Sequence, residues 1–240
     1  MLNSLTQFSN AKFGYYCAVT TTVLTVITFG IAICTPPLSG PFCQGACLQY
    51  PYTDSMNRFP RDYFWMYPAI ILSFSYLAMM LSIHQITRIE KKLYSMISVS
   101  FAVMSALVLS VDYFIQVSVI PPSLLAGETD GLALISQFNP HGIFIVLEEL
   151  GFLFMMFSFF VLLPVFSGTN SLEKAIRWTV ILGCACTIVS FILISLLYGI
   201  NREYRFEIAV ISIVWIELIV LGILFTRHFK RLEQNSKISF

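Results

Sequence analysis

The chain has 240 residues, of which 57% are hydrophobic, 15% aromatic and only 11% charged, whereas charged residues make up roughly 25% of an ordinary soluble domain. Its net charge of +1 leaves no basic surplus for a nucleic-acid-binding face, and its glycines never follow the GxGxxG or GxxxxGKS/T spacing of phosphate-binding loops. This composition indicates an integral membrane protein and argues against nucleotide-binding and nucleic-acid-binding functions.

Six apolar segments are long enough to cross a bilayer, whose core of about 30 Å requires about 20 helical residues. The first follows Lys12, as in a secretory signal, but it is longer than the apolar part of such signals, so we expect a retained helix. No internal repeat supports the inverted-repeat architecture of many transporters. We therefore expect an all-α membrane protein, a six-helix bundle forming one domain over residues 1–240, with helices near 15–35, 64–87, 94–116, 143–166, 179–200 and 208–226.

Lysine and arginine residues are distributed unequally between the two expected sides of the membrane. Ten lie on the side of the termini: Lys12, Arg88, Lys91, Lys92, Lys174, Arg177, Arg227, Lys230, Arg231 and Lys237. The other side holds Arg58, Arg61, Arg202 and Arg205. Because cytoplasmic loops collect positive charge, both termini are predicted to be cytoplasmic, in a multi-pass protein of the cell membrane.

The first outer loop, residues 36–63, is rich in proline, aromatic and small residues, which is typical of an ordered cap. It contains Cys43 and Cys47 in the sequence CQGAC, and Cys34 lies just before it. In an oxidising exterior we expect a structural disulfide between Cys43 and Cys47, or between one of them and Cys34.

The third helix carries one continuous polar stripe. Asp112 and Gln116 are one turn apart, and Ser105 and Ser98 follow in seven-residue steps below Asp112. Because a polar stripe facing lipid would be costly, it is expected to face inward. The following loop, residues 117–142, contains no Lys or Arg and is too apolar for a free linker, so it is expected to complete the cap. Glu128 and Asp130 would lie over the pocket, although a solvated loop position is the favoured interpretation for these two residues.

The fourth and sixth helices place three glutamates within apolar runs, where each ionisable group costs about 2.5–3.5 kcal/mol on insertion scales. His141 and Glu148 are seven residues apart and nearly in line, whereas Glu149 points about 100° away from Glu148. One glutamate of this pair is therefore expected to face the bundle interior and the other a neighbouring helix or the outer loop. Glu217 lies deeper, near the middle of the sixth helix.

These positions predict an outward-opening polar pocket between the third and fourth helices. Asp112, Gln116 and Glu148 would line it and His141 would lie at its rim, with Glu149 and Glu217 as further candidates. Carboxylates crowded in so dry a place cannot all be ionised, so we expect a bound proton or a cation between them. The alternative for Glu149 and Glu217 is an interhelical hydrogen bond without further function.

Metal and cofactor chemistry has little support, because the chain has only three histidines and no HExxH motif. We expect no cofactor and no metal, with a mixed site of Asp112, His141 and Glu148 as the one metal-binding alternative.

The pattern favours a non-enzymatic role: a protonation- or cation-linked transporter, or a protein that binds a small molecule or a lipid. One alternative is an accessory membrane subunit whose carboxylates hydrogen-bond between helices. A second alternative is an intramembrane enzyme that uses Asp112 and Glu148 as an acid/base pair on a lipid. Expected partners are membrane lipids and a small-molecule or lipid ligand, without nucleic acid; the sequence names neither the substrate nor the oligomeric state.

Overall fold

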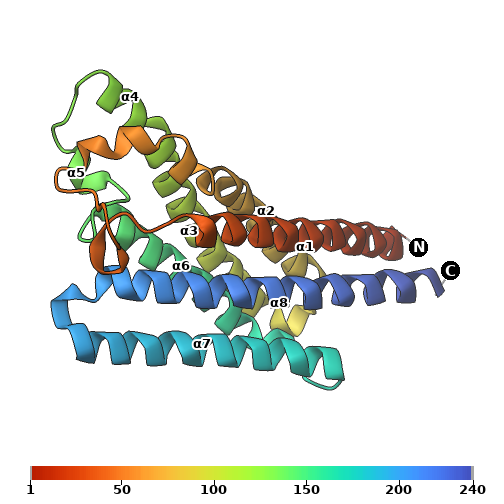
Figure 1. Ribbon diagram of the computed structural model, residues 1–240. Helices are drawn as coiled ribbons and strands as arrows, with labels where there is room; N and C mark the ends of the chain where they lie inside the picture. The colour runs from red at the N-terminus through yellow and green to blue at the C-terminus, as the bar shows by residue number, and fades with distance from the viewer. Residues whose placement is uncertain (1, 239–240) are drawn as a thin grey trace.

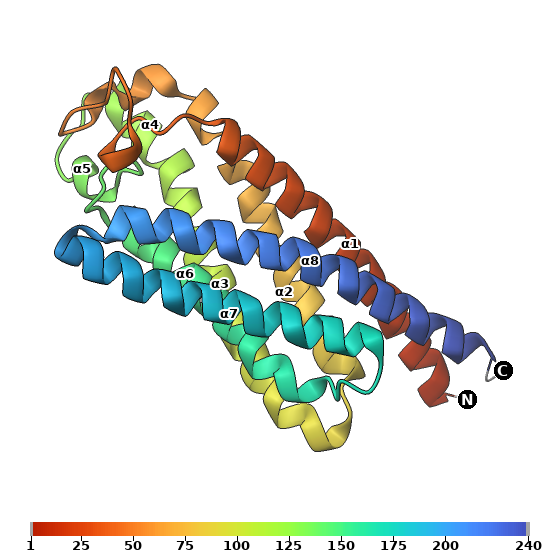
Figure 2. The same ribbon diagram turned by 60° about the horizontal axis from the view of Figure 1, so that its bottom comes forward.

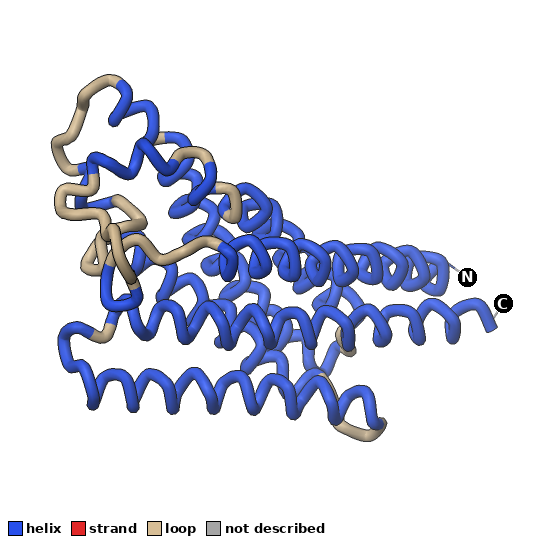
Figure 3. The backbone as a smooth tube through the Cα atoms, in the orientation of Figure 1, coloured by secondary structure: helices blue, strands red, loops and turns tan. Residues whose placement is uncertain are grey.

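The computed structural model describes residues 2–238, and the side chains of residues 10–234. These residues form long helices with shorter helical turns between them and contain no strand (Figure 1, Figure 3). Six of the helices are long and apolar enough to cross a membrane: α1 (Leu2–Cys34), α2 (Met66–Ile86), α3 (Lys92–Ser118), α6 (Ile143–Leu162), α7 (Ser171–Tyr198) and α8 (Glu203–Ile238). The predicted all-helical architecture with six such helices is confirmed.

Several helices continue past the boundaries that the apolar runs indicated. α1 and α8 extend far into their polar ends, and α7 begins at Ser171 rather than near residue 179. At the start of α7 the Asn170 side chain accepts a hydrogen bond from the Glu173 backbone N–H, which caps the helix. Apolar content marks where a helix can lie in lipid, whereas capping and backbone hydrogen bonding determine where the helix ends.

The helices are arranged with α1 and α8 side by side and antiparallel, so that both termini lie at the same end of the bundle (Figure 1, Figure 2). We refer to this end, which also holds the α2–α3 turn and the α6–α7 loop, as the termini end. α2 packs against α1 and α3, α3 packs closely against α6, and α7 packs mainly against α8. Among the apolar spans α7 is the least covered, since 17% of its most apolar window is buried, against 56% in α6.

The interface between α3 and α6 is closed by small side chains. Ser105 Oγ donates a hydrogen bond to the Gly151 carbonyl at 2.8 Å, and Ser98 Oγ donates to the Ser158 carbonyl at 2.7 Å. A Cβ atom at Gly151 would lie 2.5 Å from Leu109 Cδ2, so the two helices approach as closely as they do because residue 151 has no side chain. Ser98 and Ser105, the inner part of the polar stripe of α3, are therefore buried against α6.

The end opposite the termini is covered by the segments 36–63 and 117–142, which we call the cap (Figure 3). It contains the short helices η1 (Gly40–Phe42), η2 (Thr53–Arg58), η3 (Arg61–Tyr63), α4 (Ile120–Leu125) and α5 (Leu132–Ile135). The Cys43–Cys47 disulfide is present, as predicted, and Cys34 is a free, exposed thiol.

The cap is held to the bundle by polar and aromatic contacts. Gln116 at the end of α3 donates through Nε2 to the Ile135 carbonyl at 2.5 Å and accepts from the Gln137 backbone N–H at 2.9 Å. The ring of Tyr63 packs edge-on against that of Phe138, with centroids 6.3 Å apart. The two cap segments and the end of α3 therefore form one packed unit.

Candidate functional site

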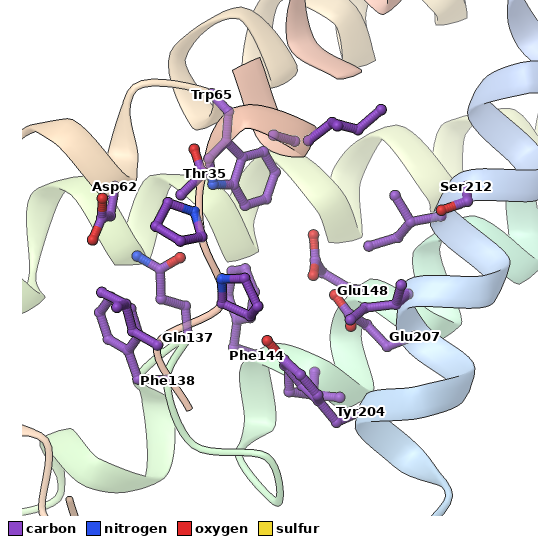
Figure 4. A pocket seen from close by; sticks show the side chains of 18 of the residues that line it. Thr35, Asp62, Trp65, Gln137, Phe138, Phe144, Glu148, Tyr204, Glu207 and Ser212 are labelled. Atoms are coloured by element: carbon purple, nitrogen blue, oxygen red, sulfur yellow. The ribbon is translucent and has the colours of Figure 1, made fainter. Parts of the chain in front are cut away.

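A cavity of about 240 Å³ lies at the cap end of the bundle, between the ends of α1, α6 and α8 and the underside of the cap (Figure 4). α8 lines one wall with residues that recur at helical spacing: Tyr204, Glu207, Ile208, Ile211, Ser212 and Trp215. α6 contributes Phe144, Ile145 and Glu148, and the remaining wall comes from the end of α1, the segment Thr35–Leu38, Asp62, Trp65, Gln137 and Phe138. The cavity is therefore enclosed by segments from the first, middle and last parts of the chain.

Two carboxyl groups from different helices meet in this cavity. Glu148 of α6 and Glu207 of α8 are only 1% and 6% exposed, and their side chains lie next to each other, facing the cavity (Figure 4). The two carboxyls lie close enough for their charges to interact, and Tyr113 also lies near Glu148. In the described part of the chain Glu148 Oε1 and Glu207 Oε2 accept no hydrogen bond.

This arrangement is unfavourable for two bare negative charges. Two ionised carboxylates repel strongly where little water screens them, and among the described residues no Lys or Arg lines the cavity to offset that repulsion. A proton shared between the two carboxyls, or a cation held between them, would remove the conflict. The pair is therefore arranged to accept positive charge.

Aromatic rings form much of the cavity wall. Trp65 and Trp215 lie edge to face with ring centroids 6.2 Å apart, and Trp215 also contacts Phe29 at 5.4 Å. Phe144 and Tyr204 complete this wall beside the two carboxyls (Figure 4). Aromatic faces attract cations through their quadrupole and provide apolar contact at the same time.

A third carboxyl, that of Asp62, lies at the cap side of the cavity and is almost completely buried. Its Oδ1 accepts a hydrogen bond from Arg61 Nε at 2.5 Å, whereas Oδ2 has no partner among the described residues. Because the Arg61 side chain is 57% exposed, this pair connects the cavity rim with the molecular surface.

Of the residues that the sequence singled out, Glu148 is the one that lines this cavity. Asp112 is buried beside Glu148, close enough for their charges to interact, but it does not line the cavity. Gln116 is buried and holds the cap, as described above. The cap-end cavity thus lies between α1, α6 and α8, whereas the predicted pocket was placed between α3 and α6.

The other candidates lie apart from the cavity. His141 is an exposed surface residue whose Nδ1 lies 3.9 Å from Glu203 Oε2. Glu149 points away from Glu148, as predicted for neighbouring helical positions, and its Oε2 pairs with Arg202 Nη1 at 3.3 Å. Glu128 and Asp130 lie on exposed parts of the cap.

Glu217 lies between α7 and α8, away from the cavity. It is 3% exposed, and a Cβ atom at Gly183 would lie 2.2 Å from its Oε2. Neither carboxyl oxygen has a hydrogen-bond partner among the described residues. Tyr76 and Cys184 lie close enough to Glu217 for an electrostatic interaction. The glutamate is thus accommodated because α7 has a glycine opposite it.

Sequence reasoning missed Glu207, because the sixth helix was expected to begin at residue 208 and the glutamate therefore to lie outside the membrane. The helix begins at Glu203. The periodic series from Tyr204 to Trp215 was the signal that could have included Glu207 in a buried helical face. The aromatic wall was missed because Trp65 and Tyr204 were assigned no place in the interior.

The described residues bring together no group of three or more His, Cys, Asp or Glu side chains that could hold a metal ion. The exposed position of His141 also separates it from Asp112 and Glu148, the set considered for a mixed site. A search of protein-family models, of curated proteins and of solved structures finds no match to this chain.

Proposed function

We propose that this chain is a multi-pass protein of the cell membrane, with the cap outside, that binds a small positively charged molecule in the cap-end cavity. The observation that carries the proposal is the pair of buried carboxyls, Glu148 and Glu207, which face one aromatic cavity and leave an oxygen each without a hydrogen bond. Binding of such a molecule is also the first step of a cation-linked transporter.

Membrane insertion and orientation are supported by three features. Six helical spans of 23 to 37 residues are apolar enough to cross a bilayer. The termini end carries ten lysines and arginines and the cap end four, which favours a cytoplasmic termini end. A disulfide in the cap fits an oxidising compartment outside the cell.

The size and composition of the cavity restrict the ligand. A volume of about 240 Å³ lies just below the range of about 300–1,000 Å³ that is common for drug-sized ligands. The aromatic and aliphatic wall suits an apolar body, and the carboxyl pair suits an ammonium or similar cationic group. We therefore propose a compact organic cation with one apolar part.

The proposal is tested by thermal unfolding of the detergent-solubilised protein with 2-phenylethylammonium and with 2-phenylethanol, a neutral compound of nearly the same shape. We expect the cation to raise the unfolding midpoint because it binds the folded state, and the alcohol to have no effect at the same concentration. Glu148→Gln and Glu207→Gln should each abolish the stabilisation. Glu217→Gln is the matched control, since it removes a buried carboxyl that does not line the cavity.

Two results would contradict the proposal. Equal stabilisation by the neutral alcohol would mean that the carboxyl pair takes no part in recognition. An equal loss of stabilisation in Glu217→Gln would mean that any buried carboxyl has the same effect, so that the cavity is not the binding site.

An accessory-subunit role is the second candidate, and the poor coverage of α7 favours it. Val189 and Leu196 on this helix are 53% and 78% exposed, and α7 has few neighbours besides α8. Under this candidate, Val189→Trp should release the chain from a larger complex in native electrophoresis of solubilised membranes. Under the cation-binding proposal the chain migrates identically with and without this substitution.

A further inference from the structure

A second cavity, of about 200 Å³, lies at the termini end of the molecule, far from the carboxyl pair in the chain's fold. It is formed by the end of α2, the η4 turn (Ile89–Lys91), the loop after η5 (Leu163–Val165) and the α8 residue His228. Segments from four parts of the chain therefore meet at one concave place among the basic residues of this end.

Three nitrogen-bearing side chains line this second cavity: Arg88, Lys91 and His228. The ion pairs within the described part of the chain involve none of the three. Lys91 Nζ donates a hydrogen bond to the Pro164 carbonyl, which fixes the η4 turn against the end of α6. The cavity thus presents positive charge that no carboxylate within the described residues neutralises by direct contact.

The one carboxylate in the lining, Glu173, is engaged by its own loop. Its oxygens accept hydrogen bonds from Ser167 Oγ at 2.5 Å, the Gly168 backbone N–H at 2.9 Å and Asn170 Nδ2 at 3.1 Å. These hydrogen bonds hold the Glu173 carboxylate against the α6–α7 loop and fix the conformation of that loop. Arg177, donating to the Leu163 and Phe166 carbonyls, fixes the loop from the other side.

Much of the remaining lining of the cavity is apolar and consists of Ile83, Ile86, Val165, Phe166 and Leu232. Two of the membrane-spanning segments end at this level, one at Ile86 and the other at Val165. In a bilayer this is the depth at which acyl chains meet phosphate headgroups. A cavity lined by both cationic and apolar side chains at this depth therefore matches a charged headgroup with the beginning of its acyl chains.

We propose that this second cavity binds the phosphate of an anionic phospholipid headgroup, held by Arg88, Lys91 and His228. Basic recesses between helices on the cytoplasmic side of a membrane bind such headgroups by charge and by hydrogen bonds to phosphate oxygens. The inference depends on the membrane insertion proposed above but not on the cap-end cavity. The apolar wall favours a lipid over free phosphate as the source of the anionic group.

The test is native mass spectrometry of the full chain in detergent, with added dioleoylphosphatidylglycerol or with the zwitterionic dioleoylphosphatidylcholine. The wild type should retain the anionic lipid in preference to the zwitterionic one. Arg88→Gln and Lys91→Gln should each weaken retention about fivefold, since one basic group near a membrane surface contributes about 1 kcal/mol. Lys91→Arg, which keeps the charge, should restore retention.

Lys12→Gln is the matched control, because it removes an exposed cation from the same end of the molecule but outside the cavity. Unchanged retention in Arg88→Gln, or an equal loss in Lys12→Gln, overturns the proposal. If inorganic phosphate stabilises the protein to heat in a way that requires Arg88 and neither lipid is retained, the phosphate site stands and its source is a soluble phosphate. Alkaline extraction of membranes checks insertion separately, so a failure there is distinguished from a failure of the lipid site.

Discussion

Gly151 on α6 is in direct contact with Leu109 on α3, and the two helices can approach so closely only because residue 151 has no side chain. The same glycine's carbonyl accepts the Ser105 hydroxyl, so that packing and hydrogen bonding reinforce each other at one point. The contact lies one helical turn below Glu148 and therefore fixes the position of one half of the carboxyl pair.

The first prediction concerns this contact. Gly151→Ala should lower the free energy of unfolding by about 1–3 kcal/mol, because the added methyl group overlaps Leu109 in a packed interface. Gly30→Ala, on α1, is the control: a Cβ atom there meets no atom within 4 Å, and its stability should be unchanged or slightly raised. Thermal unfolding in detergent measures both. Leu109→Ala introduced with Gly151→Ala should recover part of the loss, and no recovery would place the strain elsewhere.

The second prediction concerns the ion pair between Glu149 and Arg202, which connects α6 with the start of α8. Arg202→Gln should cost about 1–3 kcal/mol, since it leaves a largely buried carboxylate without its partner. Glu149→Gln combined with Arg202→Gln should be more stable than Arg202→Gln alone. Arg205→Gln serves as a control, because Arg205 bonds the Asn201 carbonyl and stacks on Tyr198 without pairing to an acid. Strictly additive effects of the two substitutions would argue against the pair.

The third prediction concerns orientation and starts from a background in which the four free cysteines are replaced by serine. In that background Tyr50→Cys, in the exposed part of the cap, should react with a membrane-impermeant maleimide on intact cells. Lys12→Cys should react only after the membrane is permeabilised. The opposite pattern would invert the proposed topology, and labelling of both sites on intact cells would contradict a cytoplasmic termini end.

The fourth prediction concerns the disulfide. Cys43 and Cys47 are four residues apart, so their bond closes a very short loop and removes little entropy from the unfolded chain. Replacing both by serine should therefore cost no more than about 2 kcal/mol on the loop-entropy relation. Cys34→Ser should have no effect, since that thiol is free. Comparing the unfolding midpoints of the wild type with and without reductant measures the stability contributed by the disulfide independently. A loss of stability much larger than about 2 kcal/mol would show that the disulfide organises the whole cap.

The fold was accessible from the sequence because length and apolar content are local properties. Each of the six helices contains a run that is long enough to be recognised without its neighbours, and CQGAC predicts the Cys43–Cys47 disulfide, although the sequence left a pairing with Cys34 open. The divergence of Glu148 and Glu149 by about 100° also follows from helical geometry, and the two side chains accordingly face different partners, Glu207 and Arg202.

The site was accessible only in part, because its walls come from helices whose pairing the sequence does not encode locally. Asp112 and Glu148 do come close, but the partner that shares the cavity with Glu148 is Glu207. Pairing of α6 with both α3 and α8 decides this, and no spacing along the chain indicates it. From the sequence, a polar stripe such as Ser98 and Ser105 is equally consistent with a pore lining and with hydrogen bonding between helices. In the structure these two hydroxyls donate hydrogen bonds to carbonyls of α6.

The pairing of α1 with α8 has a consequence for how the protein is made. α1 and α8 are neighbours although they are far apart in the sequence, and together they supply Phe29, Glu207 and Trp215 to the cap-end cavity. Until α8 has been synthesised, the part of α1 around Ala18 and Thr22, which packs against Gly222, lacks the surface that covers it. A nascent chain that stops short of α8 therefore lacks Glu207 and Trp215, so the cap-end cavity forms only after α8 has been synthesised.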